Sequence, residues 1–212
     1  MATLTWYGFK IRVRSYQIKG EALRKIGINP EYLRSGVEVC LASPSYFRRI
    51  NEILGTKPEA LAGIYISRIK KVLVPDDIGR LELCHEILHA LLDGQRESLF
   101  PRLVIEQVRL ALTNVGDPSA VKFFREIAGR TNGGYDLSDM IRMDIPGLLL
   151  HKKTRLFITE VFAFGGTKVI FERKGKKVVE KEMGEVPPEL KAYFERNLFD
   201  PQLLEAPLQK IA

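Results

Sequence analysis

A predicted helix over residues 76–93 constrains this chain more than any other feature. Asp76 and Asp77 follow Pro75 and suit the positive N-terminal end of a helix, and Gly94 is the expected C-terminal stop. Apolar side chains cover most of its circumference: Leu81, Leu83, Cys84, Ile87, Leu88, Leu91 and Leu92. This pattern predicts a largely buried helix, in which polar side chains need a partner or a function because burying them unsatisfied is costly.

Three polar side chains, His85, Glu86 and His89, interrupt this apolar helix in an H-E-x-x-H pattern. The i, i+4 spacing places both imidazoles on one face, one turn apart, where they can bind a single cation. Two histidines on a buried helix can also be ordinary core residues. However, the chain has 3 histidines in all, and two of them fall at this spacing with a glutamate at the required place. Cys84 should face the core, because consecutive helix positions point about 100° apart.

Zinc is the metal that this pattern favours. Neutral imidazoles are good zinc ligands, and a site with three protein ligands leaves a fourth position for water. Zinc lowers the pKa of that water and polarises a carbonyl, while Glu86 can act as general base and pass the proton to the leaving amine. The sequence therefore predicts a Zn²⁺-dependent hydrolase that cleaves peptide bonds in a peptide or protein substrate.

The H-E-x-x-H pattern resembles that of the zincin metallopeptidases. The metzincin subclass is excluded, because Leu92 stands where it requires glycine and Gln95 where it requires a third histidine. The remaining resemblance is to the gluzincins, whose third zinc ligand is a glutamate on a later helix. It implies an α+β, zincin-like fold, with the edge strand of a small mixed sheet over the active-site helix. A mainly helical C-terminal part with a β-hairpin follows.

Two glutamates compete for the position of third ligand, Glu160 and Glu106. At helical spacing Glu160 is flanked by apolar side chains, among which a lone carboxylate needs a cation or hydrogen bonds: Leu156, Phe157, Ala163 and Phe164. Glu106 can instead form surface ion pairs with Arg102 and Arg109. We therefore expect the metal ligands to be His85, His89 and Glu160.

Alternatives to Glu160 remain open. Glu106 lies closer to His89 in sequence, which is nearer the short spacing of the thermolysin-like gluzincins. His151 could also bind the metal, or the third ligand could come from outside the protein.

The run Thr159-Glu160-Val161-Phe162-Ala163 resembles the glutamate helix of the anthrax lethal factor-like peptidase domain. A proline-led helix from Pro187 is similar to one near the end of that domain. Small stand-alone gluzincins of prokaryotes and phages are an equally good match. The lethal factor-like domain carries a tyrosine shortly before its glutamate ligand, and residues 151–155 contain none. Tyr135 could supply an oxyanion donor instead, although tyrosines in such loops more often pack.

The rest of the N-terminal part alternates between strand and helix signals. Strands are expected over residues 4–13 and 37–42, and helices over 20–26 and 44–54. Two apolar stretches, 62–67 and 69–74, should pair in one sheet. Residues 63–66 are the expected edge strand, which in zincins pairs with an extended substrate. The alternative is an ordinary interior strand.

The C-terminal part should be mainly helical. Helices are expected over residues 102–113, 118–128, 153–164 and 187–197, with a long loop that includes one helical turn over 130–147. Gly165 and Gly166 should end the third of these helices, and a β-hairpin should span 167–182 with its turn at 174–176. We expect a single domain over 1–212, with an N-terminal α/β part over about 1–93 and a helical part over about 94–212.

Composition narrows the remaining possibilities. The formal charge is +7, but the basic residues are spread along the chain, so nucleic-acid binding is not expected as the main function. No apolar run reaches the roughly 18 residues of a membrane helix, and we recognise no signal peptide. The 2 cysteines favour a reducing compartment and a cytoplasmic location.

The alternative function is a non-catalytic zincin scaffold that acts as a binding or toxin-related module, which has no need of Glu86.

Overall fold

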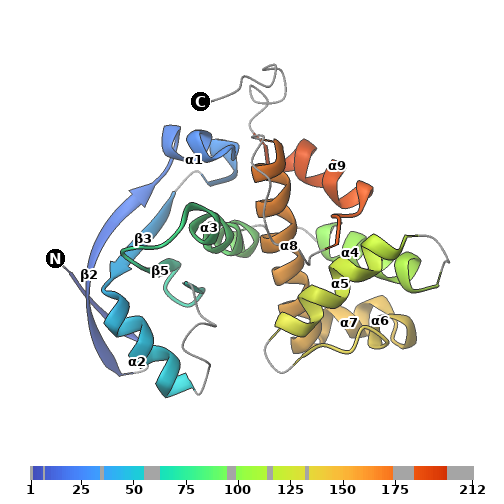
Figure 1. The fold of residues 1–212 in the computed structure, drawn as a ribbon, viewed down its shortest axis with the longest axis horizontal. Helices are drawn as coiled ribbons and strands as arrows, with labels where there is room; N and C mark the ends of the chain where they lie inside the picture. Colours follow the sequence, from blue (N-terminus) through green and yellow to red (C-terminus); the bar gives the residue numbers. More distant parts are fainter. Residues whose placement is uncertain are drawn as a thin grey trace. The chain divides into compact units, whose positions relative to one another are not determined.

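A computed structural model describes residues 2–6, 8–33, 36–54, 63–94, 99–113, 117–131, 134–173 and 184–199. The chain divides into two compact units, Met1–Gly94 and Gln95–Ala212, called here the sheet unit and the helical unit. The sheet unit contains all described strands and the helical unit only helices (Figure 1). The fold is therefore of the mixed α+β class that the sequence predicts. The single domain expected over the whole chain stays a prediction.

Five strands form the sheet: β1 (Ala2–Trp6), β2 (Phe9–Ile18), β3 (Val37–Ala42), β4 (Ile64–Ile66) and β5 (Lys71–Pro75). Their order is β1-β2-β3-β5-β4, in which β3 and β5 are parallel and the other neighbours antiparallel. The strand expected over residues 4–13 is instead a hairpin of two strands. It turns at Gly8, whose φ of 80° is a conformation that glycine adopts without strain. The pairing expected between the two apolar stretches is confirmed by β4 and β5.

Helices cover both faces of this sheet, from α1 (Glu21–Ile26), η1 (Pro30–Leu33), α2 (Pro44–Leu54) and α3 (Arg80–Gly94) (Figure 1). Phe47 and Ile50 of α2 join a core cluster with sheet residues that include Ile66. Tyr65, the residue before Ile66, points to the opposite face and reaches α3. The helix that carries the candidate site therefore packs on one face of the sheet, against β4 and β5.

The start of α3 is later than the sequence predicts. The backbone amide of Asp76 donates to the carbonyl of Ala42 at 2.9 Å, which extends the pairing of β5 with β3, and a turn follows. The carboxylate of Glu82 folds back over Gly79, directly before the helix. The helix consequently begins at Arg80 and ends at Gly94, as expected for its C-terminus. The predicted start at Asp76 and Asp77 is wrong, because a sheet hydrogen bond holds that segment.

The helical unit contains α4 (Leu99–Thr113), α5 (Pro118–Arg130), α6 (Asp139–Arg142), α7 (Ile145–Leu150), α8 (Lys152–Arg173) and α9 (Pro188–Asn197). The helix α8 has 22 residues and packs against α4, α5, α7 and α9 (Figure 1). Phenylalanines fill the space between these helices, and six of them are fully buried: Phe100, Phe123, Phe124, Phe157, Phe162 and Phe194. The helices expected around residues 102–113, 118–128 and 187–197 are confirmed.

The predicted end of α8 at Gly165 and Gly166 is wrong, because the helix continues to Arg173. A Cβ atom on Gly165 would lie 2.9 Å from Cε2 of Phe194 and 3.5 Å from Cζ of Phe123. The glycine therefore serves close packing of α5 and α9 against α8. Residues 167–173, expected as the first strand of a β-hairpin, are helical, so the predicted hairpin is wrong there. Residues 174–182, its predicted turn and second strand, lie outside the described residues.

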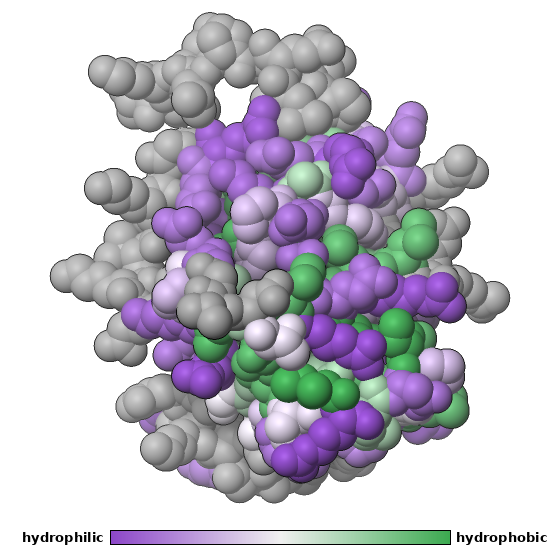
Figure 2. All heavy atoms as spheres, turned by 90° about the vertical axis from the view of Figure 1, so that its right-hand side faces the viewer, coloured by the Kyte–Doolittle hydropathy of each residue, from purple (hydrophilic) through white to green (hydrophobic). Residues whose placement is uncertain are grey.

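The segment predicted as a long loop over 130–147 contains α6 and the start of α7. The side chain of Asp144 accepts a hydrogen bond from the amide of Gly147 at 3.0 Å and begins α7. The guanidinium of Arg109 on α4 donates to the carbonyls of Met140 and Met143 at 2.6 and 2.7 Å. In the view of Figure 2, hydrophobic residues lie among hydrophilic ones. No helix in the described segments is long and apolar enough to cross a membrane.

Candidate metal centre

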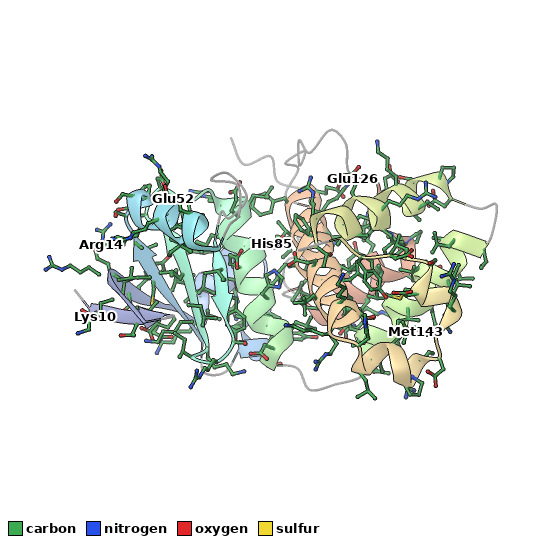
Figure 3. All side chains as sticks on the ribbon, turned by 90° about the horizontal axis from the view of Figure 1, so that it is seen from below. Lys10, Arg14, Glu52, His85, Glu126 and Met143 are labelled. Carbon is green, nitrogen blue, oxygen red and sulfur yellow. The ribbon has the colours of Figure 1, made fainter. Side chains whose placement is uncertain are left out.

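The two histidines of the motif lie together on α3. Their Nε2 atoms are 3.0 Å apart, and their rings meet edge to face with centroids separated by 4.6 Å. Both side chains are half-buried, and Figure 3 shows His85 on the side of α3 that faces away from the sheet. Cys84, one position earlier, is buried in the core, as predicted. The expected placement of His85 and His89 on one face of a helix is therefore confirmed.

Glu86 is only 7% exposed, and it is the only buried carboxylate among the described residues. Its aliphatic stem passes against the backbone just before β4. A Cβ atom on Gly63 would lie 2.7 Å from Cγ of Glu86 and 2.9 Å from Cγ1 of Val74. The absence of a side chain at Gly63 thus makes the space that Glu86 occupies. Two adjoining imidazoles are donors that fit a metal ion, and a buried carboxylate lies one residue after the first of them.

The strand β4 stands at the end of the strand order, so the predicted edge strand is confirmed for residues 64–66. Sequence reasoning missed how this strand is fixed. The hydroxyl of Tyr65 donates to Oδ2 of Asp93 at 2.7 Å, and Nζ of Lys70 donates to the same oxygen. Asp93 lies one helical turn after His89, so these bonds connect the edge strand with the helix that carries the histidines. The only sequence signal was an aspartate at i+4 from the second histidine.

The charges of this small network follow from its contacts. Burial and the hydrogen bond to Asp93 raise the pKa of Tyr65 above its usual value. Burial alone would raise the pKa of Asp93, but the hydrogen bonds from Lys70 and Tyr65 and the charge of Lys70 lower it overall. The carboxylate of Asp93 is therefore ionised at neutral pH, and Tyr65 is neutral and able to donate.

Glu160 lies on α8, in the helical unit, and is half-buried. The expectation that it points into an apolar face is met in part. Phe157 and Ala163 are buried, but Leu156 is 41% exposed and Phe164 is half-buried. Glu160 thus lies at the border between the buried and the accessible side of α8, where a carboxylate can reach a ligand without being sealed in the core.

The alternatives for the third ligand have different surroundings. Glu106 is exposed on α4, and Arg109, one of its two expected ion-pair partners, binds the carbonyls at the end of α6. His151 is exposed at the C-terminal end of α7, and its Nδ1 lies 3.3 Å from Oγ1 of Thr154. The exposure of Glu106 agrees with the surface role that the sequence predicts for it.

Tyr135 packs inside the helical unit. It is 7% exposed, stacks on Phe157 with centroids 5.0 Å apart, and its hydroxyl lies 2.9 Å from Oγ1 of Thr154. Burial raises its pKa above the usual value. The packing interpretation of Tyr135 is therefore favoured over a role as oxyanion donor.

Replacing Gly63 by alanine is expected to destabilise the sheet unit, because the new methyl group would overlap Glu86 and Val74. Overpacking of this kind typically costs about 1–3 kcal/mol of unfolding free energy. Chemical denaturation measures the change. Gly129→Ala is the matched control: its Cβ would meet open space in α5, so it should be neutral or stabilising. Equal stability of the two variants would show that Glu86 does not lie against residue 63.

The chain was compared with protein-family models, curated proteins and solved structures, and none of them matches it. The functional proposal therefore depends on the chemistry of the residues themselves.

Proposed function

We propose that this protein is a zinc-dependent metallopeptidase of the gluzincin type with a zincin-like sheet unit. One observation carries the proposal: His85 and His89 adjoin on α3, and Glu86, one residue after His85, is buried against Gly63 directly before the edge strand β4. Two neutral nitrogens and a nearby base are what zinc-assisted peptide hydrolysis requires. The substrate class is a peptide or an unfolded segment of a protein.

The proposed ligands are Nε2 of His85, Nε2 of His89 and a carboxylate oxygen of Glu160. Each side chain offers one ligand atom of a kind that zinc binds, an imidazole nitrogen or a carboxylate oxygen. Two imidazoles and one carboxylate are the ligand set of gluzincin-type catalytic zinc, and they leave a position for water. A bound zinc ion would lower the pKa of that water and polarise the scissile carbonyl.

Glu86 is the proposed general base. Its burial against Gly63 limits the positions that its carboxylate can take, and the helix places it one residue from His85. It would accept the proton of the attacking water and deliver it to the leaving amine. A structural zinc site has no need of such a base, so the buried carboxylate favours catalysis over a purely structural role.

The edge strand β4 is the proposed substrate-binding strand. An extended peptide can pair with a strand edge through main-chain hydrogen bonds, without a particular side chain on either partner. The hydrogen bonds of Tyr65 and Lys70 with Asp93 hold β4 against the last turn of α3. They would keep a bound peptide at a fixed distance from Glu86.

Metal content tests the proposal directly. Elemental analysis of protein purified without chelator should give one zinc per chain, and His85→Ala and His89→Ala should each lose most of it, because each removes one of three ligands. His151→Ala, which removes the third histidine of the chain, should keep full zinc. Chelation should lower the melting temperature of the wild type, since a ligand bound only by the folded state stabilises it.

The outcomes separate the alternatives. Full zinc in both the His85→Ala and the His89→Ala protein would place the metal elsewhere and end the proposal. Loss of zinc from His151→Ala would instead make His151 a ligand.

A further inference from the structure

We propose that the exposed face of the β1–β2 hairpin binds the backbone of single-stranded nucleic acid. This surface is called the basic row and consists of Lys10, Arg12, Arg14 and Tyr16. It lies on the sheet unit, does not include the candidate metal centre, and requires no peptidase activity. Its function would be to hold a polyanion, a second activity of the same protein.

The geometry of β2 creates the basic row. Side chains two residues apart in a strand point to the same face at intervals of about 7 Å. Lys10, Arg12 and Arg14 are exposed, whereas Ile11 and Val13 between them are buried in the core. Three cations therefore stand in line on one face. Figure 3 shows the labelled side chains of Lys10 and Arg14 projecting from the sheet.

Neighbouring groups on this face suit a phosphodiester backbone. Thr5 of β1 pairs with Lys10 and Thr3 with Arg12, so both exposed hydroxyls stand beside the cations and can donate to phosphate oxygens. Asp76 approaches Arg14 at 3.9 Å, but both side chains are exposed, at 67% for Arg14 and 40% for Asp76, and such a pair is weak. The positive charge of the row therefore remains available.

Tyr16 favours a single strand over other polyanions. It continues the row and is 40% exposed, so its ring is accessible next to the third cation. Surfaces that bind single strands combine a line of cations with aromatic rings on which bases stack. A membrane-binding surface usually adds apolar anchors to its cations. Among the residues of β1 and β2 whose side chains the structure describes, which leave out Trp6 and Phe9, Tyr16 is the only exposed large hydrophobic one.

Binding of a fluorescein-labelled oligothymidine of about 20 nucleotides, followed by anisotropy at several salt concentrations, tests the proposal. The triple variant Lys10→Gln, Arg12→Gln, Arg14→Gln should bind at least about tenfold more weakly at low salt. Its plot of log K against log salt should be shallower by about 2, because each lost phosphate contact removes roughly 0.7 from the slope. Tyr16→Ala should weaken binding roughly tenfold and leave the slope unchanged.

A charge-matched control separates binding at the basic row from nonspecific electrostatic attraction of the oligonucleotide to the protein. The triple variant Lys152→Gln, Lys153→Gln, Arg155→Gln removes the same charge from exposed positions of α8 and should bind like the wild type. All substitutions are at exposed positions, and unchanged melting temperatures would verify folding. Equal weakening in both triple variants, or no binding by the wild type, would overturn the proposal. So would row-dependent binding to phosphatidylserine vesicles without binding to the oligonucleotide.

Discussion

The Glu86→Gln protein is expected to keep its zinc and its fold and to lose hydrolysis of an unfolded protein substrate. Glutamine has nearly the same shape as glutamate, so it should fit the space beside Gly63 and Val74. It cannot accept the proton of the attacking water. Removing a general base typically lowers the rate by about 10² to 10⁴. Cleavage of a fluorescence-quenched unfolded protein, measured beside zinc content, gives both quantities on one preparation.

Glu52→Gln is a suitable control for that experiment, because Glu52 is exposed on α2 of the same sheet unit (Figure 3). It should retain wild-type activity. A fully active Glu86→Gln protein would rule out the proposed peptidase mechanism, whereas an inactive wild type with one zinc per chain would favour a non-catalytic binding or toxin-related module.

Local features of the fold could be predicted from the sequence. The i, i+4 spacing of His85 and His89 places their rings together whenever the segment is helical, and α3 is helical there. The strand signal over residues 37–42 likewise predicts β3, and the two apolar stretches before α3 predict the pairing of β4 and β5. In each case neighbours in the chain determine the result.

The predictions that were wrong share a different cause, which is contact with residues distant in the sequence. Gly165 and Gly166 are helix-ending signals in sequence, but Phe194 and Phe123 pack against the helix at Gly165. This packing outweighs the cost of a glycine in a helix, which is about 1 kcal/mol per residue relative to alanine. Asp76 looks like a helix start until its amide pairs with Ala42. Such partners are known only once the tertiary structure is known.

The residues around the candidate site show the same division. The sequence identifies Glu86, because its place in the motif is local. It does not show that Gly63 makes room for Glu86, or that Tyr65 and Lys70 bind Asp93, because 23 or more residues separate each pair of bonded or contacting partners. From the sequence alone, Gly63 and Tyr65 are recognisable only as parts of an edge strand.

Replacement of the proposed third zinc ligand is expected to have the next largest effect. Glu160→Gln should weaken zinc binding by orders of magnitude, because an amide is a much poorer zinc ligand than a carboxylate, while Glu106→Gln should change it little. Glu106 is exposed on α4, where solvent satisfies its charge. Zinc affinity measured by competition with a chromophoric chelator, on both variants and the wild type, makes the comparison.

Position on the helix, and not distance along the sequence, decides between the two glutamates. Glu160 is half-buried beside the buried Phe157 and Ala163, so its carboxylate gains more from a bound cation than one fully in water. A crystal structure of the zinc-bound protein should therefore show an oxygen of Glu160 about 2.0 to 2.2 Å from the metal. If the oxygen at that distance belongs to Glu106, the shorter spacing of the thermolysin-like gluzincins is the better guide, and the half-buried carboxylate of Glu160 must be stabilised by other partners in the helical unit.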